Sequence, residues 1–310
     1  MDACIALMRT TMIAVSEGRA VTPLRTILPV AGAGFLGNMP GYLAEPECFG
    51  VKLVSIFPGN VAAGLSSHLG LVLLFEPVHG RPVAMMDAGE ITAIRTAAAS
   101  GMATDLLAKK DAGDLAILGS GEQARSHLEA MLAVRPIRRV RVWSRTRANA
   151  EAFADEQGKA HALTIEVADD VPSAVRGADI ICAVSHAPEP ILMGDWIEPG
   201  THLNAVGSST PRTAEIDTAA VVKSRLFVDM RQSAHNEAGE YLRAIEAKAI
   251  TPAHILGEIG EVANGSVPGR LSESDITLYK SLGVAAQDMA SASYLLEAAK
   301  AKGVGQVVEF

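Results

Sequence analysis

The second part of the chain, from about residue 114 onward, alternates short apolar runs with segments of helical spacing. The apolar runs cover residues 115–118, 138–143, 163–167, 180–184, 202–206 and 226–228. Strands that are separated by helices pair in parallel, because the chain crosses back over the sheet between one strand and the next. The pattern therefore predicts an α/β fold with a doubly wound parallel sheet.

The first ninety or so residues have a different pattern, in which short extended pieces are separated by clusters of Gly, Pro and Asn. We expect strands over 25–30, 50–57, 71–76 and 82–87, which together form a sheet module. Residues 89–109 lack proline and are rich in Ala, Thr, Ile, Met and Leu, which predicts a long helix near the domain boundary. A final helix is expected over 274–302, with Ser272 and Asp275 as its capping signal.

Length and composition exclude several classes of protein. The 310 residues are enough for two domains, and 27 basic against 35 acidic side chains give a formal charge of −8, which argues against nucleic acid as a partner. The 49% of hydrophobic residues suggest extensive burial and a subunit interface. No apolar stretch reaches the roughly 18 residues that span a bilayer, and no basic leader opens the chain, so we expect a protein of the cytoplasm without membrane partners.

The cysteines and histidines point to neither a disulfide framework nor a metal site. Cys4, Cys48 and Cys182 are odd in number, widely spaced and outside any CxxC pair. None of the eight histidines has the spacing of a zinc motif. We therefore predict no metal, and we interpret Cys182 as a core residue.

The glycine pattern GxGxx(G/A) occurs twice, and the two copies differ in context. The first, Gly32 to Gly37, follows Pro29 and runs into Pro40, where a helix cannot start cleanly. A nucleotide site needs a strand before the turn and a helix after it, because the diphosphate rests on free N–H groups at the helix N-terminus. We expect the first copy to be a loop or hairpin.

The second copy, Gly119-Ser120-Gly121-Glu122-Gln123-Ala124, has both required neighbours. An apolar run ends at Leu118, and strong helix formers follow from Glu122. Gly119 allows the tight turn, Gly121 lets the backbone approach the diphosphate, and Ala124 permits close packing of helix on strand. This copy predicts a dinucleotide site, the alternative being a glycine turn in a sheet without a ligand.

The end of the next predicted strand bears on which nucleotide binds. An NAD site expects an acid there, but residues 139–143 are followed by Ser144, Arg145, Thr146 and Arg147. Guanidinium groups pair with phosphate oxygens through two parallel hydrogen bonds, so this turn suits the 2′-phosphate of NADPH. The alternative is a solvated basic turn, and NADH stays possible.

Three cations stand in apolar surroundings in the first part of the chain. Arg95 is the only charge between Thr92 and Thr104, Lys52 alternates with apolar residues along its strand, and Arg25 follows Pro23-Leu24. An unpaired buried cation is costly, so Arg95 needs a carboxylate such as Asp87 or Glu90, or a substrate anion. Together the three suggest a pocket for a carboxylate, provided that the protein's own acids do not neutralise them. The alternative is a set of structural ion pairs.

His68 lies beside Ser66 and Ser67, ahead of an apolar run. An imidazole at this position could donate a proton or orient a substrate. The alternative is a histidine that is satisfied by local hydrogen bonds.

The sequence resembles the ornithine cyclodeaminase and mu-crystallin family over nearly its full length. The motifs that carry the resemblance lie at residues 21–26, 50–54, 91–98, 119–124, 204–207 and 280–283. The resemblance implies a homodimer with a Rossmann dinucleotide-binding domain inserted in an α+β substrate-binding and dimerisation domain. In this chain the former would cover 94–275, and the latter 1–93 plus 276–310. Relatives carry more chain before the segment that matches 1–7, which raises the question of an upstream start.

The resemblance also implies that Arg25, Lys52 and Arg95 hold the substrate carboxylate. Together with the sequence surroundings of His68, this gives Lys52, Arg95 and His68 as catalytic candidates. Ser67 and Ser209 would be further substrate contacts. The cofactor contacts would be Gly119, Ser120, Gly121, Glu122, Gln123, Ala124, Ser144, Arg145, Thr146, Val206, Gly207 and Ser281.

Family membership leaves the reaction open, and one position helps to choose. Cyclodeaminases have an aspartate where this chain has Ser209, and a cyclic imine has no second ammonium group that needs such an acid. We therefore expect an NAD(P)H-dependent reductase of small cyclic ketimino acids, which yields L-proline or L-pipecolate. The alternatives are an ornithine cyclodeaminase or alanine dehydrogenase-type deaminating enzyme, and a nucleotide-dependent ligand-binding protein of the mu-crystallin type.

Overall fold

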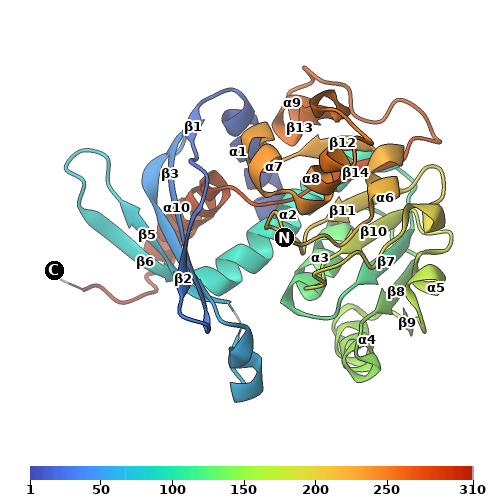
Figure 1. Ribbon diagram of the computed structural model, residues 1–310. Coiled ribbons are helices and arrows are strands. Elements are labelled where there is room, and N and C mark those ends of the chain that lie inside the picture. Colours follow the sequence, from blue (N-terminus) through green and yellow to red (C-terminus); the bar gives the residue numbers. More distant parts are fainter. Residues whose placement is uncertain (67, 309–310) are drawn as a thin grey trace. The chain divides into compact units, whose positions relative to one another are not determined.

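The computed structural model describes residues 1–66 and 68–308 and divides the chain into two compact units. Unit 1 consists of Met1–Ser16 and Thr96–Gly283, and unit 2 consists of Glu17–Arg95 and Val284–Phe310. Figure 1 labels their helices and strands. Each unit is built around its own sheet, so each is described by itself.

Unit 1 contains the parallel sheet, with strand order β13-β12-β14-β11-β10-β7-β8-β9 (Figure 1). Its strands are β7 (Asp114–Leu118), β8 (Arg139–Trp143), β9 (Ile165–Val167), β10 (Ile180–Ala183), β11 (His202–Ala205), β12 (Arg225–Val228), β13 (Ile255–Glu258) and β14 (Thr277–Lys280). Every pair of neighbours in this order is parallel. The order reverses between β7 and β10, as in a Rossmann fold, and the predicted doubly wound sheet is confirmed.

Helices cover both faces of this sheet. Along β7, Leu115 and Ile117 join one buried cluster, while Ala116 and Leu118 join the other. A sheet buried on both faces has continuously apolar strands, which explains the runs in the sequence. The helices of unit 1 are α3 (Glu122–Val134), α4 (Arg147–His161), α5 (Val171–Val175), α6 (Thr218–Lys223), α7 (Arg231–Glu237), α8 (Gly239–Glu246), α9 (Ile259–Ala263) and the short 3-10 helices η2 (Gly194–Trp196) and η3 (Pro252–His254).

The helix predicted over 274–302 is wrong in its first part. Residues 277–280 form β14, a fully buried strand between β11 and β12, and α10 (Ala285–Lys302) begins only after Gly283, whose φ is +76°. Asp275 does not cap a helix; its carboxylate accepts hydrogen bonds from the backbone N–H groups of Leu271 and Ser272 and closes a turn before the strand. A short apolar run looks the same in a buried strand and in a buried helix.

Helix α1 (Asp2–Ser16) was not predicted, and it belongs to unit 1. It packs on α9, where a Cβ at Gly260 would collide with the carbonyl oxygen of Met12. The hydroxyl of Ser16 donates to Glu258 at 2.9 Å. The compact units therefore differ from the expected domain ranges, because residues 1–16 and 276–283 lie with the parallel sheet.

Helix α2 (Ala88–Leu107) corresponds to the long helix expected over 89–109. Within unit 1, a Cβ at Gly101 would lie 3.1 Å from Ile5, so glycine permits close packing there. The buried guanidinium of Arg135 donates to the carbonyl oxygens of Thr104, Asp105 and Ala108 and so caps the end of the helix. Neither α2 nor any other helix in the described ranges has the length and hydropathy to span a membrane.

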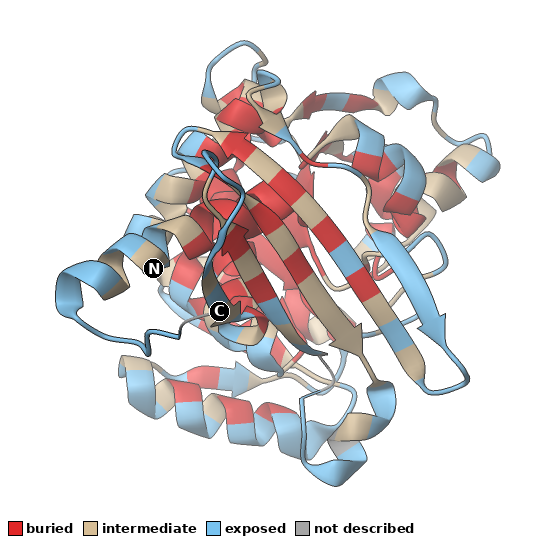
Figure 2. Cartoon of the chain, turned by 90° about the vertical axis from the view of Figure 1, so that its left-hand side faces the viewer, coloured by how far each residue is buried: buried red, intermediate tan, exposed pale blue. Residues whose placement is uncertain are grey.

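Unit 2 contains the antiparallel sheet, in the order β1-β3-β4-β5-β6 with β2 paired to β3. Its elements are β1 (Ala20–Val21), β2 (Thr26–Val30), β3 (Gly34–Ala44), β4 (Glu47–Ile56), η1 (Pro58–Ala63), β5 (His68–Phe75), β6 (Pro82–Asp87) and α10. Helix α10 covers one face of the sheet, and a Cβ at Gly41 would lie 2.9 Å from that of Ala285. Figure 2 shows the strands banded by burial. Alternate positions point to the helix and away from it.

The first glycine copy lies in the hairpin between β2 and β3, as expected. Gly32 has a φ of +68° in the turn, which the N–H of Ala33 closes by donating to the carbonyl of Val30 at 2.9 Å. Gly34 then enters β3, where a Cβ would collide with the carbonyl oxygen of Ile56. Gly32 therefore serves the turn and Gly34 serves close strand packing, and a strand rather than a helix follows the turn.

Candidate active site

Lys52 and Arg95 form a buried cationic pair in unit 2. Lys52 lies on β4 and is 2% exposed, with Met39 and Val72 beside it on the neighbouring strands. Arg95 lies on α2 and is 4% exposed. Both cations are therefore buried, and Lys52 has the apolar neighbours that the sequence predicted.

Both cations meet the same carboxylate, that of Asp288 on α10. The Lys52 ammonium lies 2.9 Å from Asp288, and the Arg95 Nε donates to Asp288 Oδ1 at 3.0 Å. Arg95 Nη1 also donates to the side chain of Gln287 at 2.6 Å. The prediction of Asp87 or Glu90 as the partner of Arg95 is wrong, because Asp87 instead accepts the N–H of Gly89 at 2.8 Å and caps the start of α2.

Burial and charge shift the pKa values of this cluster. Burial lowers the pKa of Lys52 to about 8 although Asp288 opposes this, and the charges of Arg95 and Arg25 lower it further. Burial alone would raise the pKa of Asp288, but Arg95 and Lys52 hold it below its ordinary value. Two cations that share one carboxylate keep a net positive charge, which favours the addition of an anion.

The pair also keeps hydrogen-bond donors for such an anion. Among residues 1–66 and 68–308, no group accepts from Arg95 Nη2. Lys52 makes a long hydrogen bond of 3.4 Å to the hydroxyl of Thr92, besides its contact with Asp288. Arg25 is close enough for its charge to act on Lys52. A carboxylate can be held by donors of this kind, which form short, charge-assisted hydrogen bonds.

Ser67 and His68 were also predicted as site residues in this part of the chain. Ser67 lies outside the described residues. His68 begins β5, where its backbone pairs in register with Ile56 of β4.

In unit 1 the second glycine copy joins β7 to α3 with the geometry of a nucleotide loop. Gly119 has a φ of +133°, and a Cβ there would lie 2.7 Å from the carbonyl oxygen of Val184. Gly121 is the N-cap of α3, is exposed and has open space on its Cβ side, while Ala124 is fully buried against the sheet. The loop lies at the carboxyl end of β7, at the point where the strand order reverses, which is where such sheets bind dinucleotides.

The turn after β8 presents the guanidinium groups of Arg145 and Arg147, which differ in their partners. The hydroxyls of Ser144 and Ser120 are hydrogen-bonded at 3.0 Å, which ties this turn to the glycine loop. Arg147 forms ion pairs with Glu151 and Asp169. Arg145 is exposed and has no hydrogen bond or ion pair within the described chain.

Thr146 is the exposed N-cap of α4, and its side chain makes no capping hydrogen bond. Its hydroxyl therefore does not cap the helix, and with the Arg145 guanidinium it is an exposed polar group of this turn.

Glu215 organises the loops that follow β10 and β11, and the sequence reading missed it. Its buried carboxylate accepts the backbone N–H and the hydroxyl of Ser185, both at 2.6 Å, and the N–H of Gly207 at 2.5 Å. Burial raises the pKa of Glu215 to about 7, although the hydrogen bonds from Ser185 oppose this. A Cβ at Gly207 would collide with the carbonyl oxygen of Ser185, so only glycine fits beside Val206.

Lys280 and Ser281, at the end of β14, are buried beside the same loops. The Lys280 ammonium donates to the carbonyl of Ser208 at 2.5 Å and pairs with Glu240 at 3.2 Å. The buried hydroxyl of Ser281 has no partner in the described part of the chain. Ser209 is half-buried in the loop after β11.

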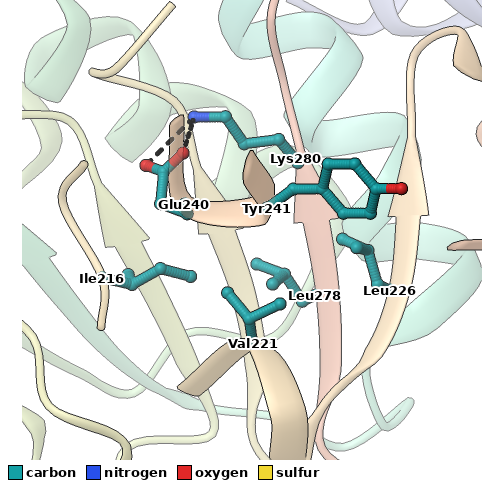
Figure 3. Close-up of a pocket in the computed structure, with 7 residues that line it drawn as sticks. All are labelled: Ile216, Val221, Leu226, Glu240, Tyr241, Leu278 and Lys280. Carbon is teal, nitrogen blue, oxygen red and sulfur yellow. Dashed lines mark hydrogen bonds and ion pairs between the residues drawn. The ribbon is translucent and has the colours of Figure 1, made fainter. Parts of the chain in front are cut away.

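The cavity beneath the Lys280–Glu240 pair is not a ligand site. Figure 3 shows that it is lined mainly by apolar side chains of α6, α8, β12 and β14, including Val221 and Leu278. Its volume is about 10 Å³, which is room for about one water molecule.

Comparisons with known proteins show the family of the chain. The mouse ketimine reductase mu-crystallin is 41% identical over 283 residues, which cover 91% of this chain and 86% of that one. The structure of Thermococcus litoralis Δ1-pyrroline-2-carboxylate reductase with NADH and L-proline has a TM-score of 0.96 at 38% identity, covering 98% of this chain and 95% of that chain. An archaeal alanine dehydrogenase dimer with bound NAD has a TM-score of 0.94 at 31% identity, covering 100% and 95%. The profile of the ornithine cyclodeaminase/mu-crystallin family matches residues 1–303. The resemblance found in the motifs is confirmed, and the chain belongs to the ornithine cyclodeaminase/mu-crystallin family.

Proposed function

We propose that the protein reduces small cyclic ketimino acids, such as Δ1-pyrroline-2-carboxylate and Δ1-piperideine-2-carboxylate, to L-proline and L-pipecolate. Its class is that of the NAD(P)H-dependent oxidoreductases, in agreement with its relatives. The observation that carries the choice of substrate is the buried pair of Lys52 and Arg95, which share one carboxylate and so keep positive charge. A ketimino acid brings the anion that this pair favours.

Lys52, Arg95 and Arg25 would hold the substrate carboxylate. Several directional hydrogen bonds to one carboxylate fix the ring in a single orientation, so that its C=N carbon is presented for reaction and the step becomes effectively unimolecular. In the reaction this carbon gains a hydride and the ring nitrogen gains a proton. The proton would come from water or from a group such as His68.

The residues of unit 1 fit a nicotinamide cofactor, which supplies the hydride when bound. The open space at Gly121 and the uncapped start of α3 leave backbone N–H groups for a diphosphate. Val206, Gly207 and Ser281, whose buried hydroxyl has no partner among the described residues, lie at the same edge of the sheet and would be further contacts. Glu215 would keep the Gly207 loop in place through its hydrogen bonds.

We propose NADPH as the preferred cofactor because of Arg145. Its exposed guanidinium has no acid partner among the described residues, whereas Arg147 is held by two acids. A 2′-phosphate could therefore pair with Arg145 without breaking an existing ion pair. The two structural relatives described above carry NADH and NAD, so NADH is the competing cofactor in the test.

The open face of the antiparallel sheet supports a homodimer. In one cross-strand row Pro40, Val51, Leu73 and Met85 lie side by side on the face opposite the buried side chain of Lys52, and Met85 is 64% exposed. An apolar sheet face of this kind is usually covered by a partner. The archaeal alanine dehydrogenase relative is described as a dimer. Size-exclusion chromatography with light scattering tests the dimer, and fractionation of the producing cells tests the expected cytoplasmic location.

Steady-state oxidation of NADPH by Δ1-pyrroline-2-carboxylate tests the proposed function. The reductase predicts turnover well above the rate without enzyme, with formation of L-proline. No turnover, but saturable binding of the nucleotide, supports the ligand-binding alternative. Release of ammonia and proline from ornithine with NAD supports the cyclodeaminase alternative, against which the serine at position 209 argues.

A further inference from the structure

Asp288 is placed where a helix end and two cations meet. It lies in the first turn of α10 and is fully buried. The N-terminus of a helix carries partial positive charge, so on its own it would repel Lys52 and Arg95. A carboxylate at this point reverses the interaction and lets both cations pack against the helix.

The contacts of Asp288 join three separate elements of unit 2. It accepts from Lys52 on β4 and from Arg95 on α2, while its own backbone belongs to α10. The neighbouring Gln287 accepts from Arg95 Nη1 at 2.6 Å and from the N–H of Val284 at 3.4 Å. Adjacent residues of one helical turn thus accept hydrogen bonds from Nε and Nη1 of the guanidinium. These contacts fix its plane and leave Nη2 available as a donor to a ligand.

We propose that Asp288 is a positioning residue, which holds the Lys52 ammonium and the Arg95 guanidinium in the geometry and charge state that bind the substrate carboxylate. The inference rests on the proposed function and deepens it, because it gives the carboxylate of Asp288 a role in binding the substrate carboxylate. Direct contact between Asp288 and the substrate anion would be repulsive, so its role is exerted through the two cations.

The charged groups around Lys52 make this role measurable. Arg95 from α2 and Arg25 from the segment before β2 disfavour its protonation, and Asp288 from α10 favours it. Cys48, on the same strand face, stays neutral because burial raises its pKa to about 11. The strands on either side present Met39 and Val72, which carry no charge. Loss of the Asp288 charge should therefore deprotonate Lys52 at lower pH.

The test is the pH profile of Asp288→Asn against the wild type. We expect the alkaline limb of kcat/KM for Δ1-pyrroline-2-carboxylate, near pH 8 in the wild type from the Lys52 pKa of about 8, to move about one to three pH units lower. The affinity for pyrrole-2-carboxylate, a planar ring acid measured by calorimetry without turnover, should show the same shift. Glu76→Gln removes another carboxylate of unit 2, one that holds backbone N–H groups of an exposed loop, and should leave the limb unmoved.

An unmoved limb in folded Asp288→Asn, for both turnover and binding, would overturn the inference. Asp288→Glu provides a second reading if the asparagine variant does not fold. It keeps the charge and displaces it by one methylene, so we expect an unchanged limb with KM raised about tenfold or more. A wild-type KM in that variant would equally refute a positioning role. Failure of the wild type itself to bind or reduce either ring acid would instead refute the proposed function.

Discussion

Replacement of Lys52 by methionine removes one cation of the buried pair and keeps a side chain of similar length. Asp288 then still accepts from Arg95 at 3.0 Å, so no buried charge is left without a partner. Replacing a buried ion by a well-packed apolar group is often neutral or stabilising. We therefore expect Lys52→Met to fold and to have a melting temperature equal to or above that of the wild type.

The same replacement should strongly reduce turnover. The cluster loses its net positive charge and the charge-assisted hydrogen bond proposed to the substrate carboxylate, a contact that contributes about 1.5–3 kcal/mol. The Coulomb interaction of two charges about 4 Å apart at an effective dielectric constant of 20 is about 4 kcal/mol. A loss of about 2–4 kcal/mol corresponds to a fall in kcat/KM of about 30- to 1,000-fold.

The assay is the decrease of nicotinamide absorbance with Δ1-pyrroline-2-carboxylate at saturating cofactor. Lys300→Met is the matched control, because Lys300 is on α10 but is exposed, and within residues 1–66 and 68–308 it pairs only with Glu297. Its kcat/KM should equal that of the wild type. If folded Lys52→Met kept wild-type kcat/KM, the assignment of this cation to carboxylate binding would be wrong.

Four further predictions concern other parts of the molecule. Burial lowers the pKa of His127 to about 4, so the folded state binds fewer protons than the unfolded state between pH 4 and 6.5. Urea unfolding should therefore show a free energy of unfolding that falls by about 3 kcal/mol as the pH falls through this window. In His127→Gln this part of the pH dependence should be absent. Arg145→Ala should reduce the preference for NADPH over NADH, as a ratio of kcat/KM values, by about 10- to 100-fold, while Arg147→Ala changes it less. Gly207→Ala, which places a Cβ against a carbonyl oxygen, should weaken NADPH binding by about tenfold or more in a fluorescence titration, and an unchanged affinity would contradict the close fit. Met85→Glu on the open sheet face should yield monomers in light scattering, and a persistent dimer would place the interface elsewhere.

Local patterns in the sequence predicted much of unit 1. The strands of a sheet that is buried on both faces are short, continuous apolar runs, and the Gly119 loop carries its own spacing. Strand β14 was not predicted, because Thr277–Lys280 is short and is soon followed by a helix, so that the pattern of strand and helix together resembles one long helix. Helix α1 was not predicted, because the residues after it are rich in turn-forming Gly, Pro and Asn and favoured a sheet module over all of the first ninety positions.

The candidate site was only half visible in the sequence. Lys52 and Arg95 stood out as lone cations, but their partner lies 236 and 193 residues further along the chain, and no short-range pattern connects them. The sequence does contain a signal for Asp288 of the same kind as for the two cations, since Asp288 is the only charged residue between Lys280 and Glu297. A lone acid in a small, apolar helix needs a cation, just as a lone cation in such a helix needs an anion.

The late position of β14 and α10 in the chain has a consequence for biosynthesis. The parallel sheet lacks an interior strand until residues 277–280 have been made, and the antiparallel sheet lacks its covering helix until residues 285–302 follow. During translation both sheets would therefore expose apolar surface, and Lys52 would stay hydrated until α10 arrives. A chain that stops before residue 285 should be captured by chaperones or degraded, although it contains every residue proposed to contact the cofactor or the substrate.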